Sequence, residues 1–244
     1  MSFASDTNNK AYSSVGDGTQ TLEQIEEAVI YNRWIASRFM PYLGQKNLEI
    51  GAGIGTISAI LSKSYPLDLT EISSDCRQVL MNRFAEKSNV KVLDRDYQEV
   101  RGSYDCIYSS NVLEHVENDF SYLAKSSELL KGGGFFVAIV PGHQLLLSDF
   151  DRSIGHHRRY SLIDRLRLSD EIKIQNLPLR LHQYRYYNPV GAIGWLLKMK
   201  ILKQDHIKMS DVKKMEALVP YLKKLDLINF GFGQNLLMAF QKIK

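Results

Sequence analysis

Three glycines stand at alternate positions in the segment Gly51–Gly55, directly after the short apolar run Asn47–Ile50. Glycine lets the backbone turn tightly and lets its amide groups approach a ligand closely, which a Cβ atom would prevent. Glu71 ends a second apolar run, and a carboxylate there can accept hydrogen bonds from both hydroxyls of a ribose. This spacing predicts a nucleoside-binding crevice at the carboxyl edge of a sheet.

The spacing of the glycines also separates two classes of ligand. The dinucleotide-binding fingerprint G-x-G-x-x-G would need glycine at position 56, where this sequence has Thr56. Glu49 would lie awkwardly near a pyrophosphate, whereas its carboxylate could help to hold a cationic or amino-bearing ligand. An NAD(P)-dependent oxidoreductase is therefore the disfavoured alternative. A non-catalytic nucleoside-binding scaffold is the second alternative, because it would keep the same crevice.

These residues must be positioned by apolar runs that alternate with helical patterns. We expect strands over residues 47–50, 67–72, 90–93, 104–109 and 135–140, and helices over 54–63, 74–86 and 120–130. Such alternation predicts βαβ units and a parallel sheet that is buried on both faces. A capping box at Thr21 and Gln24 predicts an earlier helix that continues toward Met40.

The pattern changes after Pro141. A loop of about twenty residues is expected there, then helices near 189–203 and 211–225 and a last apolar run at 236–240. The 244 residues suit one sizeable domain. We predict a flexible tail over residues 1–20 and a single domain over 21–244. Within it, the cofactor-binding core covers about 45–142 and a substrate or cap region covers about 143–230.

The composition, with 44% apolar and 24% charged residues, is that of an ordinary globular chain. The N-terminus has no secretory signal pattern, and the longest wholly apolar or glycine run, Val190–Leu197, is too short to span a bilayer. Cys76 and Cys106 are too few for a disulfide framework. We therefore expect a soluble or peripheral protein in the cytoplasm.

The formal charge of +4 is concentrated in one segment. Between Lys198 and Asp226, eight lysines face four acidic residues, which is a local charge of +4. A solvated helix face is one interpretation and contact with an anionic surface is the other. The apolar stretch 188–203 could cover the acceptor pocket, pack against a second copy or rest on a membrane interface; packing as a lid against the core is the first choice.

Taken in order, several motifs resemble a class I S-adenosylmethionine-dependent methyltransferase over about residues 30–142. They are ExGxGxG at 49–55, Glu71, Asp96, YDCIYSSNVLEHVEND and ELLKGGGFFVAIVP. More loosely, GHHRRYS and GQNLLMAFQK resemble the C-terminal half of a bacterial small-molecule subgroup. The resemblance implies a Rossmann-like α/β fold with a mostly parallel seven-stranded sheet, an antiparallel last strand over 235–241, helices on both faces and helical insertions that cap the crevice.

The resemblance also implies S-adenosyl-L-methionine as the cofactor. The glycines would shape the floor under its methionine part, Glu49 would orient that part, and Glu71 would take the ribose hydroxyls. Asp96 would meet the adenine amino group, with Asp94 as the competing candidate. The full set of expected cofactor contacts is Glu49, Gly51, Gly53, Gly55, Glu71, Ile72, Asp96, Tyr97, Asn111 and Val112.

The acceptor side is expected near the loop after Pro141. Methyl transfer needs alignment of the two partners, and a hydroxyl acceptor benefits from a positioned base. The candidate bases are His115, His156 and His157, although a structural hydrogen-bonding role is the favoured alternative for His115. Four side chains of the loop could bind an acidic acceptor, or could pin the loop by salt bridges: Arg152, Arg158, Arg159 and Tyr160.

The sequence therefore predicts methyl transfer to an O or N atom of a small molecule, with an acidic sugar or glycolipid as the preferred acceptor. Ser109–Asn111 differs from the D/N-P-P-Y/F loop of nucleic-acid amino-methyltransferases, so no nucleic-acid partner is expected. No metal site is expected either, because His143, His156 and His157 lack paired thiols or a regular helical spacing. Peripheral membrane contact and the oligomeric state stay open.

Overall fold

The computed structural model describes residues 26–204, 206, 209–226, 228 and 231–243. The tail expected over residues 1–20 and the capping box at Thr21 and Gln24 lie outside this part of the chain. Among the described residues, no helix is long and apolar enough to cross a membrane.

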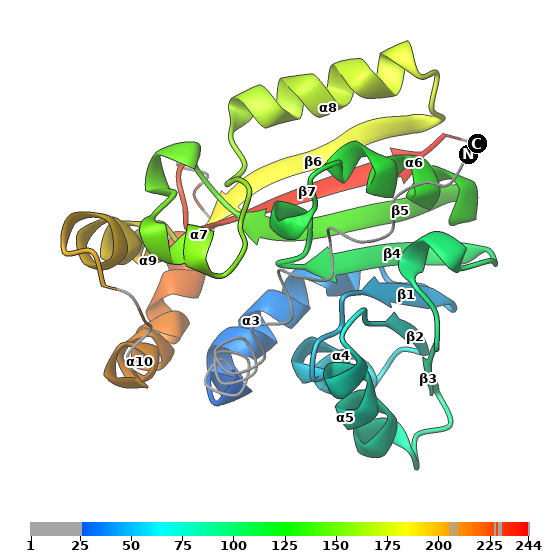
Figure 1. Ribbon diagram of the computed structural model, residues 1–244, viewed down its shortest axis with the longest axis horizontal. Coiled ribbons are helices and arrows are strands. Elements are labelled where there is room, and N and C mark those ends of the chain that lie inside the picture. The colour runs from blue at the N-terminus through cyan, green and yellow to red at the C-terminus, as the bar shows by residue number, and fades with distance from the viewer. Residues whose placement is uncertain (1–25, 205, 207–208, 227, 229–230, 244) are drawn as a thin grey trace.

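Seven strands form one sheet in the order β3-β2-β1-β4-β5-β7-β6 (Figure 1). Strands β1 to β5 pair in parallel, and β7 runs antiparallel between β5 and β6. This order confirms the expected Rossmann-like sheet with its antiparallel last strand. The strands are β1 (Asn47–Ile50), β2 (Leu67–Thr70), β3 (Val90–Val92), β4 (Tyr104–Ser110), β5 (Leu130–Pro141), β6 (Leu179–Tyr187) and β7 (Asn235–Lys242).

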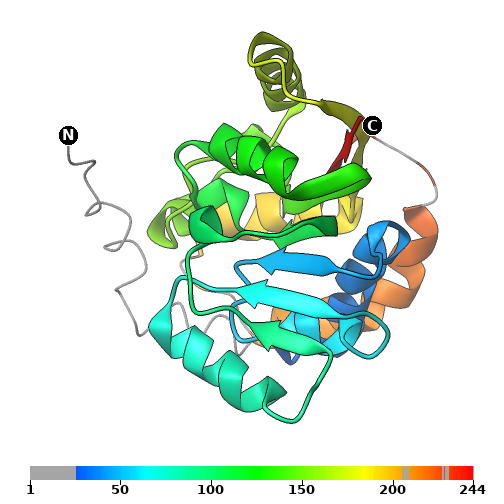
Figure 2. The same cartoon turned by 90° about the vertical axis from the view of Figure 1, so that its right-hand side faces the viewer.

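Helices cover both faces of the sheet, as Figures 1 and 2 show. The α-helices are α3 (Val29–Phe39), α4 (Thr56–Leu61), α5 (Ser74–Phe84), α6 (Asp119–Leu129), α7 (Asp149–Ser153), α8 (Leu162–Ile174), α9 (Pro189–Trp195) and α10 (Met209–Leu225). Shorter turns are η1 (Met40–Tyr42), η2 (Tyr97–Glu99), η3 (Leu113–His115) and η4 (Gln144–Leu146), and the π-helical turn η5 (Leu196–Ile201) continues α9.

The hydrophobic core consists of two layers because alternate residues of each strand point to opposite faces. On β5, Phe136 and Ala138 pack in the layer that α6 and α8 cover, whereas Val137 and Ile139 pack in the layer that α3, α4 and α5 cover. A third, smaller cluster joins Trp34 of α3 to α10, and the two helices lie side by side in Figure 2. A sheet buried on both faces is what the near-continuous apolar runs predicted.

The region after Pro141 differs from the sequence expectation. The stretch expected as a loop contains η4 and α7, and the elements α8 and β6 were not predicted. Helix α8 begins at a capping box in which Ser161 and Asp164 exchange hydrogen bonds, and this S-x-x-D signal was available in the sequence. Strand β6 lies at the edge of the sheet, and most of its residues are partly exposed, which hides it from a search for apolar runs.

Candidate active site

The carboxyl ends of β1, β2 and β4 meet at one edge of the sheet. Ile50 is paired with Thr70 on one side and with Ser109 on the other, so the residues that follow these three positions are neighbours. The glycine turn, Glu71 and Asn111 therefore come together although they are far apart in sequence. This is the edge at which open α/β sheets bind their ligands.

The glycine turn needs its glycines. Gly51, Gly53 and Gly55 have φ angles of +65°, +56° and +87°, a region that side chains rarely adopt. A Cβ atom on Gly51 would come within 2.6 Å of a methyl carbon of Val112, which lies between β4 and η3. The turn and Val112 are thus in close contact, as expected for two parts of one crevice.

Glu71 connects the second strand to the glycine turn. Its carboxylate accepts hydrogen bonds from the backbone amides of Gly53 at 2.8 Å and of Ser73 at 2.9 Å. The side chain is buried, and burial raises its pKa, although the two amide hydrogen bonds lower it. The next residue, Ile72, is 47% exposed and offers an apolar surface beside the carboxylate. The structure therefore holds Glu71 in a fixed position at the crevice.

Glu49 lies in the middle of this region, buried at the end of β1. Its Oε2 atom accepts hydrogen bonds from Ser58 Oγ at 2.5 Å and from Tyr108 Oη at 2.9 Å. Burial raises the pKa of Glu49 to about 7, against the two hydroxyl hydrogen bonds, which lower it. Sequence reasoning missed Tyr108, because a tyrosine inside an apolar strand gives no sign of its partner.

The region expected to hold adenine follows β3. Asp96 is partly exposed and caps η2 by accepting a hydrogen bond from the Gln98 amide at 2.8 Å. Tyr97 is buried and stacks on Tyr122 with ring centroids 5.1 Å apart. The competing candidate, Asp94, is exposed and pairs with Arg77 at 3.3 Å. The preference for Asp96 stays a prediction.

A second group of titratable side chains lies beyond β4. Glu114 is fully buried, and neither of its carboxylate oxygens has a hydrogen-bond partner among the residues that the structure describes. His156 lies between two acids: its Nδ1 is 3.0 Å from Asp151 Oδ1 and its Nε2 is 3.9 Å from Glu114 Oε1. Burial raises the pKa of Glu114 to about 7, although the neighbouring His156 lowers it. Sequence reasoning missed both acids, since nothing in the sequence shows that they face one histidine.

The other two histidines have different surroundings. The ring of His115 meets the ring of His156 edge to face at 4.6 Å, and burial, together with His156, lowers the pKa of His115 to about 4. His115 is therefore neutral at pH 7. His157 is exposed, and its backbone amide donates to the carbonyl of Glu114 at 2.8 Å.

Three residues of this cluster could hold a metal ion. Glu114, His115 and His156 each offer a ligand atom, and these atoms lie within 4.8 Å of one another. The sequence analysis considered a different set of histidines and did not foresee this grouping. The expectation that the chain holds no metal stays a prediction.

The arginines of the loop are mostly engaged inside the protein. Arg159 is buried, donates to Asp151 Oδ1 from two nitrogens at 3.0 and 2.7 Å, and lies over the ring of Trp195. Arg158 pairs with Asp119 at 3.2 Å, and Tyr160 donates to the same carboxylate at 2.8 Å. These contacts favour the interpretation in which salt bridges pin the loop.

Arg152 differs from the two arginines that follow it. Its side chain is exposed on α7, and it forms no ion pair with any acidic group that the structure describes.

Asp151 is buried and fully engaged. Despite its burial, hydrogen bonds from His156 and Arg159 hold its pKa well below its usual range. Asp151 thus joins the histidine and the buried arginine into one network.

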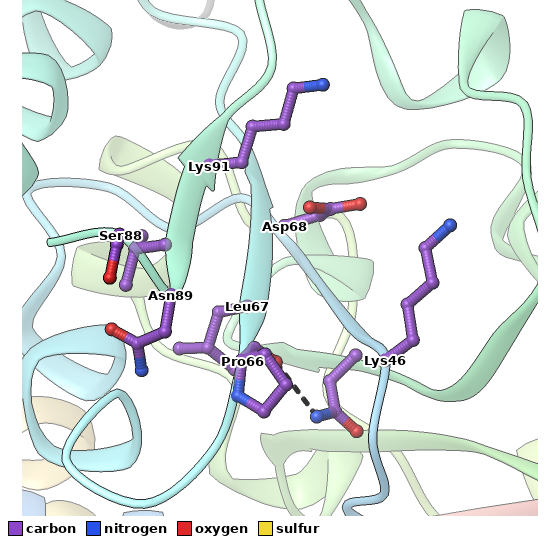
Figure 3. A pocket seen from close by; sticks show the side chains of 9 residues that line it. Lys46, Pro66, Leu67, Asp68, Ser88, Asn89 and Lys91 are labelled. Carbon is purple, nitrogen blue, oxygen red and sulfur yellow. Dashed lines mark hydrogen bonds between the residues drawn. The ribbon is translucent and has the colours of Figure 1, made fainter.

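Two cavities lie at the opposite, amino edge of the sheet. One, of about 180 Å³, is lined by residues at the starts of β1, β2 and β3, where Asn47 donates to the carbonyl of Pro66 at 2.9 Å (Figure 3). The other, of about 290 Å³, is lined by Tyr42, Asp105 and the whole segment Lys131–Phe135. Neither cavity contains any residue of the expected cofactor or acceptor site.

Comparison with known proteins agrees with the geometry. Residues 48–136 match the family model described as a methyltransferase domain. The chain is 24% identical over 196 residues to a ubiquinone biosynthesis O-methyltransferase of Shewanella halifaxensis, covering 75% of this chain and 74% of that protein. It is 26% identical over 124 residues to a trans-aconitate 2-methyltransferase of Deinococcus radiodurans, covering 46% and 48%.

Solved structures show the same fold. The geranyl diphosphate C-methyltransferase of Streptomyces coelicolor A3(2), solved with S-adenosyl-L-homocysteine, superposes with a TM-score of 0.63 at 13% identity, covering 96% of this chain and 87% of that one. A phosphoethanolamine-type N-methyltransferase of Haemonchus contortus gives 0.61 at 14% identity, covering 98% and 60%.

The sheet order and the glycine turn with its carboxylate partner agree with this similarity to methyltransferases, which in sequence covers residues 48–136 for the family model. The solved structures show that the chain shares their fold.

Proposed function

We propose that the protein transfers the methyl group of S-adenosylmethionine to an oxygen or nitrogen atom of a small molecule. The observation that carries this proposal is the pair of hydrogen bonds by which Glu71 joins the glycine turn to the end of β2. Backbone amides as donors, with a ribose-binding carboxylate and a buried acid as acceptors, are the hydrogen-bonding groups that an adenosyl amino acid needs at one sheet edge. The cofactor supplies an electrophilic methyl group on a positively charged sulfur.

The residues of the crevice then have distinct proposed roles. Glu71 binds the ribose hydroxyls, and Asp96 accepts from the adenine amino group. Glu49 is held by two hydroxyl groups and has a pKa near neutrality, so a cationic ligand beside it favours its charged form. Ile72 offers an exposed apolar face to a planar base.

The base for a hydroxyl acceptor is proposed among the histidines of the second group. His156 is held between Asp151 and Glu114, so we assign it a positioning role. His115 and His157 remain as the candidates for direct proton transfer, and His157 is the more exposed of the two. An amine acceptor would need no base, provided that it arrives neutral.

The nature of the acceptor is proposed more coarsely. The relatives' names describe an O-methyltransferase of ubiquinone biosynthesis and a methyltransferase of trans-aconitate, and both names favour a small metabolite. An acidic sugar or glycolipid stays a prediction. Of the three arginines that suggested it, Arg152 is the exposed one without an ion pair among the described residues.

Two measurements test this function against its alternatives. Titration calorimetry with S-adenosylhomocysteine and with NADH should show binding of the first and not of the second; the reverse result would support the oxidoreductase. Incubation with methyl-labelled S-adenosylmethionine and a cell extract should label a small molecule. Binding of S-adenosylhomocysteine with no labelled product from any extract would instead support the non-catalytic scaffold.

A further inference from the structure

A strip of apolar side chains faces outward on α9 and η5. It consists of Ile193, Leu197, Ile201 and Leu202, whose side chains are between 50% and 67% exposed. Ile193, Leu197 and Ile201 are four residues apart, which is the spacing of one face of a helix, and Leu202 follows Ile201 directly. We call these four residues the apolar strip. The sequence analysis expected this stretch to be packed against the core, and that expectation holds for the other face alone.

The opposite face of the same segment is fixed to the protein. Ala192 and Met199 are buried, and the ring of Trp195 packs against Phe150 of α7 at 5.7 Å and lies under Arg159. The apolar strip is therefore displayed by a helix that is held firmly from behind. It is not the loose end of a segment that could fold inward.

The apolar surface extends onto a neighbouring turn. Leu145 in η4 is 74% exposed, and the Lys200 ammonium donates to the Leu145 carbonyl, which places the two segments next to each other. Two chain segments that are more than 40 residues apart in sequence thus contribute large apolar side chains to one surface. An isolated exposed leucine needs no explanation, but several exposed apolar side chains on two adjoining segments favour an interaction site.

Exposed lysines lie on the segments next to this surface. Lys203 comes directly after Leu202, and α10, which the ion pair of Lys198 with Asp211 joins to η5, carries four further exposed lysines: Lys213, Lys214, Lys223 and Lys224. None of these five pairs with an acidic side chain of the described chain, whereas Lys198 pairs with Asp211. Helices α9 and α10 lie at the same end of the molecule (Figure 1).

The position of the apolar strip relates it to the active site. Helix α9 follows β6, which runs parallel to β5, and η4 follows β5 itself, so both leave the sheet at its carboxyl edge. This is the edge that carries the glycine turn, Glu71 and the histidine group. The surface therefore lies on the side of the molecule from which an acceptor would enter.

We propose that the apolar strip docks on the surface of a lipid bilayer that contains anionic headgroups. Exposed apolar side chains with exposed lysines on the neighbouring segments are typical of a contact with an anionic membrane interface. A second copy of the chain fits less well, because a twofold interface would bring the same lysines of two protomers together. Docking in this orientation turns the acceptor side of the crevice toward the membrane.

Vesicle flotation tests the proposal. The wild-type protein should float with vesicles of phosphatidylcholine containing about one third phosphatidylglycerol, should bind pure phosphatidylcholine vesicles less, and should be released in part by high salt. The variant Ile193→Ser/Leu197→Ser/Ile201→Ser should bind the anionic vesicles at least about tenfold more weakly, because its apolar anchors are lost.

The control changes three apolar residues of α8 that are more exposed, at 56–77% against 50–61%, in the variant Ile163→Ser/Leu166→Ser/Ile174→Ser. It should keep wild-type vesicle binding. An equal loss in both variants, or no binding by the wild type, would overturn the proposal. The proposal would also be overturned if light scattering showed that the wild type is a dimer and that the first variant is a monomer, because a second copy would then cover the strip. The affinity for S-adenosylhomocysteine, measured in the same variants without vesicles, should not change. If the wild type itself does not bind S-adenosylhomocysteine, the proposed function is refuted instead.

Discussion

Replacement of Glu71 by alanine is the most direct test of the crevice. The carboxylate accepts hydrogen bonds from two backbone amides at 2.8 and 2.9 Å and is the group that we expect to bind the ribose hydroxyls. A hydrogen bond to a charged group contributes about 1.5–3 kcal/mol. At about 1.4 kcal/mol per tenfold change, this loss raises the dissociation constant of S-adenosylhomocysteine by about 10- to 150-fold.

The same substitution also affects the empty protein, and the two effects can be separated. Alanine leaves the amides of Gly53 and Ser73 without their acceptor, which costs about 1–3 kcal/mol for each amide that water cannot reach. We therefore expect a lower free energy of unfolding in urea as well as weaker binding. Glu71→Gln keeps one acceptor oxygen but loses the charge, so its affinity should fall between those of the wild type and Glu71→Ala.

The assay is titration calorimetry on protein that circular dichroism shows to be folded. Glu86→Ala, which changes an exposed glutamate just beyond α5, serves as the control and should bind like the wild type. If Glu71→Ala binds S-adenosylhomocysteine within about twofold of the wild type, the ribose does not rest on this carboxylate. The cofactor site would then have to be placed elsewhere.

Three further outcomes are expected. Glu114→Gln should make the free energy of unfolding less dependent on pH. The folded-state pKa of Glu114, about 7, lies above the ordinary value, so wild-type stability falls as the pH rises from about 5 to 8. The same pH dependence of the free energy of unfolding in both proteins, measured by urea denaturation, would contradict this. Gly51→Ala should abolish cofactor binding and lower the melting temperature, whereas Gly194→Ala, with open space around its new Cβ, should do neither. His156→Ala and His157→Ala should keep the affinity for S-adenosylhomocysteine but lower methyl transfer from labelled cofactor; unchanged transfer in the double variant would leave alignment alone as the mechanism.

The first half of the fold could be predicted because each of its signals is local. The glycine turn and the acid at the end of the next strand need only chain order and strand period to be placed at one edge. Strands β1, β2 and β4 of this half are mostly buried on both faces, so they appear in the sequence as apolar runs. Their predicted bounds differ from the observed ones by a few residues, the start of β5 at Leu130 being the largest difference.

The acceptor side could not be derived in the same way. Glu114 stands next to His115 in the sequence, but it also faces His156, which lies 3.9 Å away and comes with its partner Asp151 from the segment after β5. For Arg159 the sequence left acceptor binding and a salt bridge both open, and the structure shows an ion pair with an acid eight residues earlier. Such pairings depend on how a loop folds back over the sheet, and neither spacing nor composition encodes that path.

The insertion of β7 between β5 and β6 has a consequence for biosynthesis. Strand β6 is hydrogen-bonded to β7 alone in the described sheet, yet the ribosome makes β6 almost 50 residues earlier. Until Asn235–Lys242 has been translated, β5 has an open edge, and β6, which follows α8 in the chain, has no partner strand in the described sheet. The nascent chain can therefore complete this sheet only after β7 has been translated, and until then this half of the molecule is the one most in need of protection from premature association.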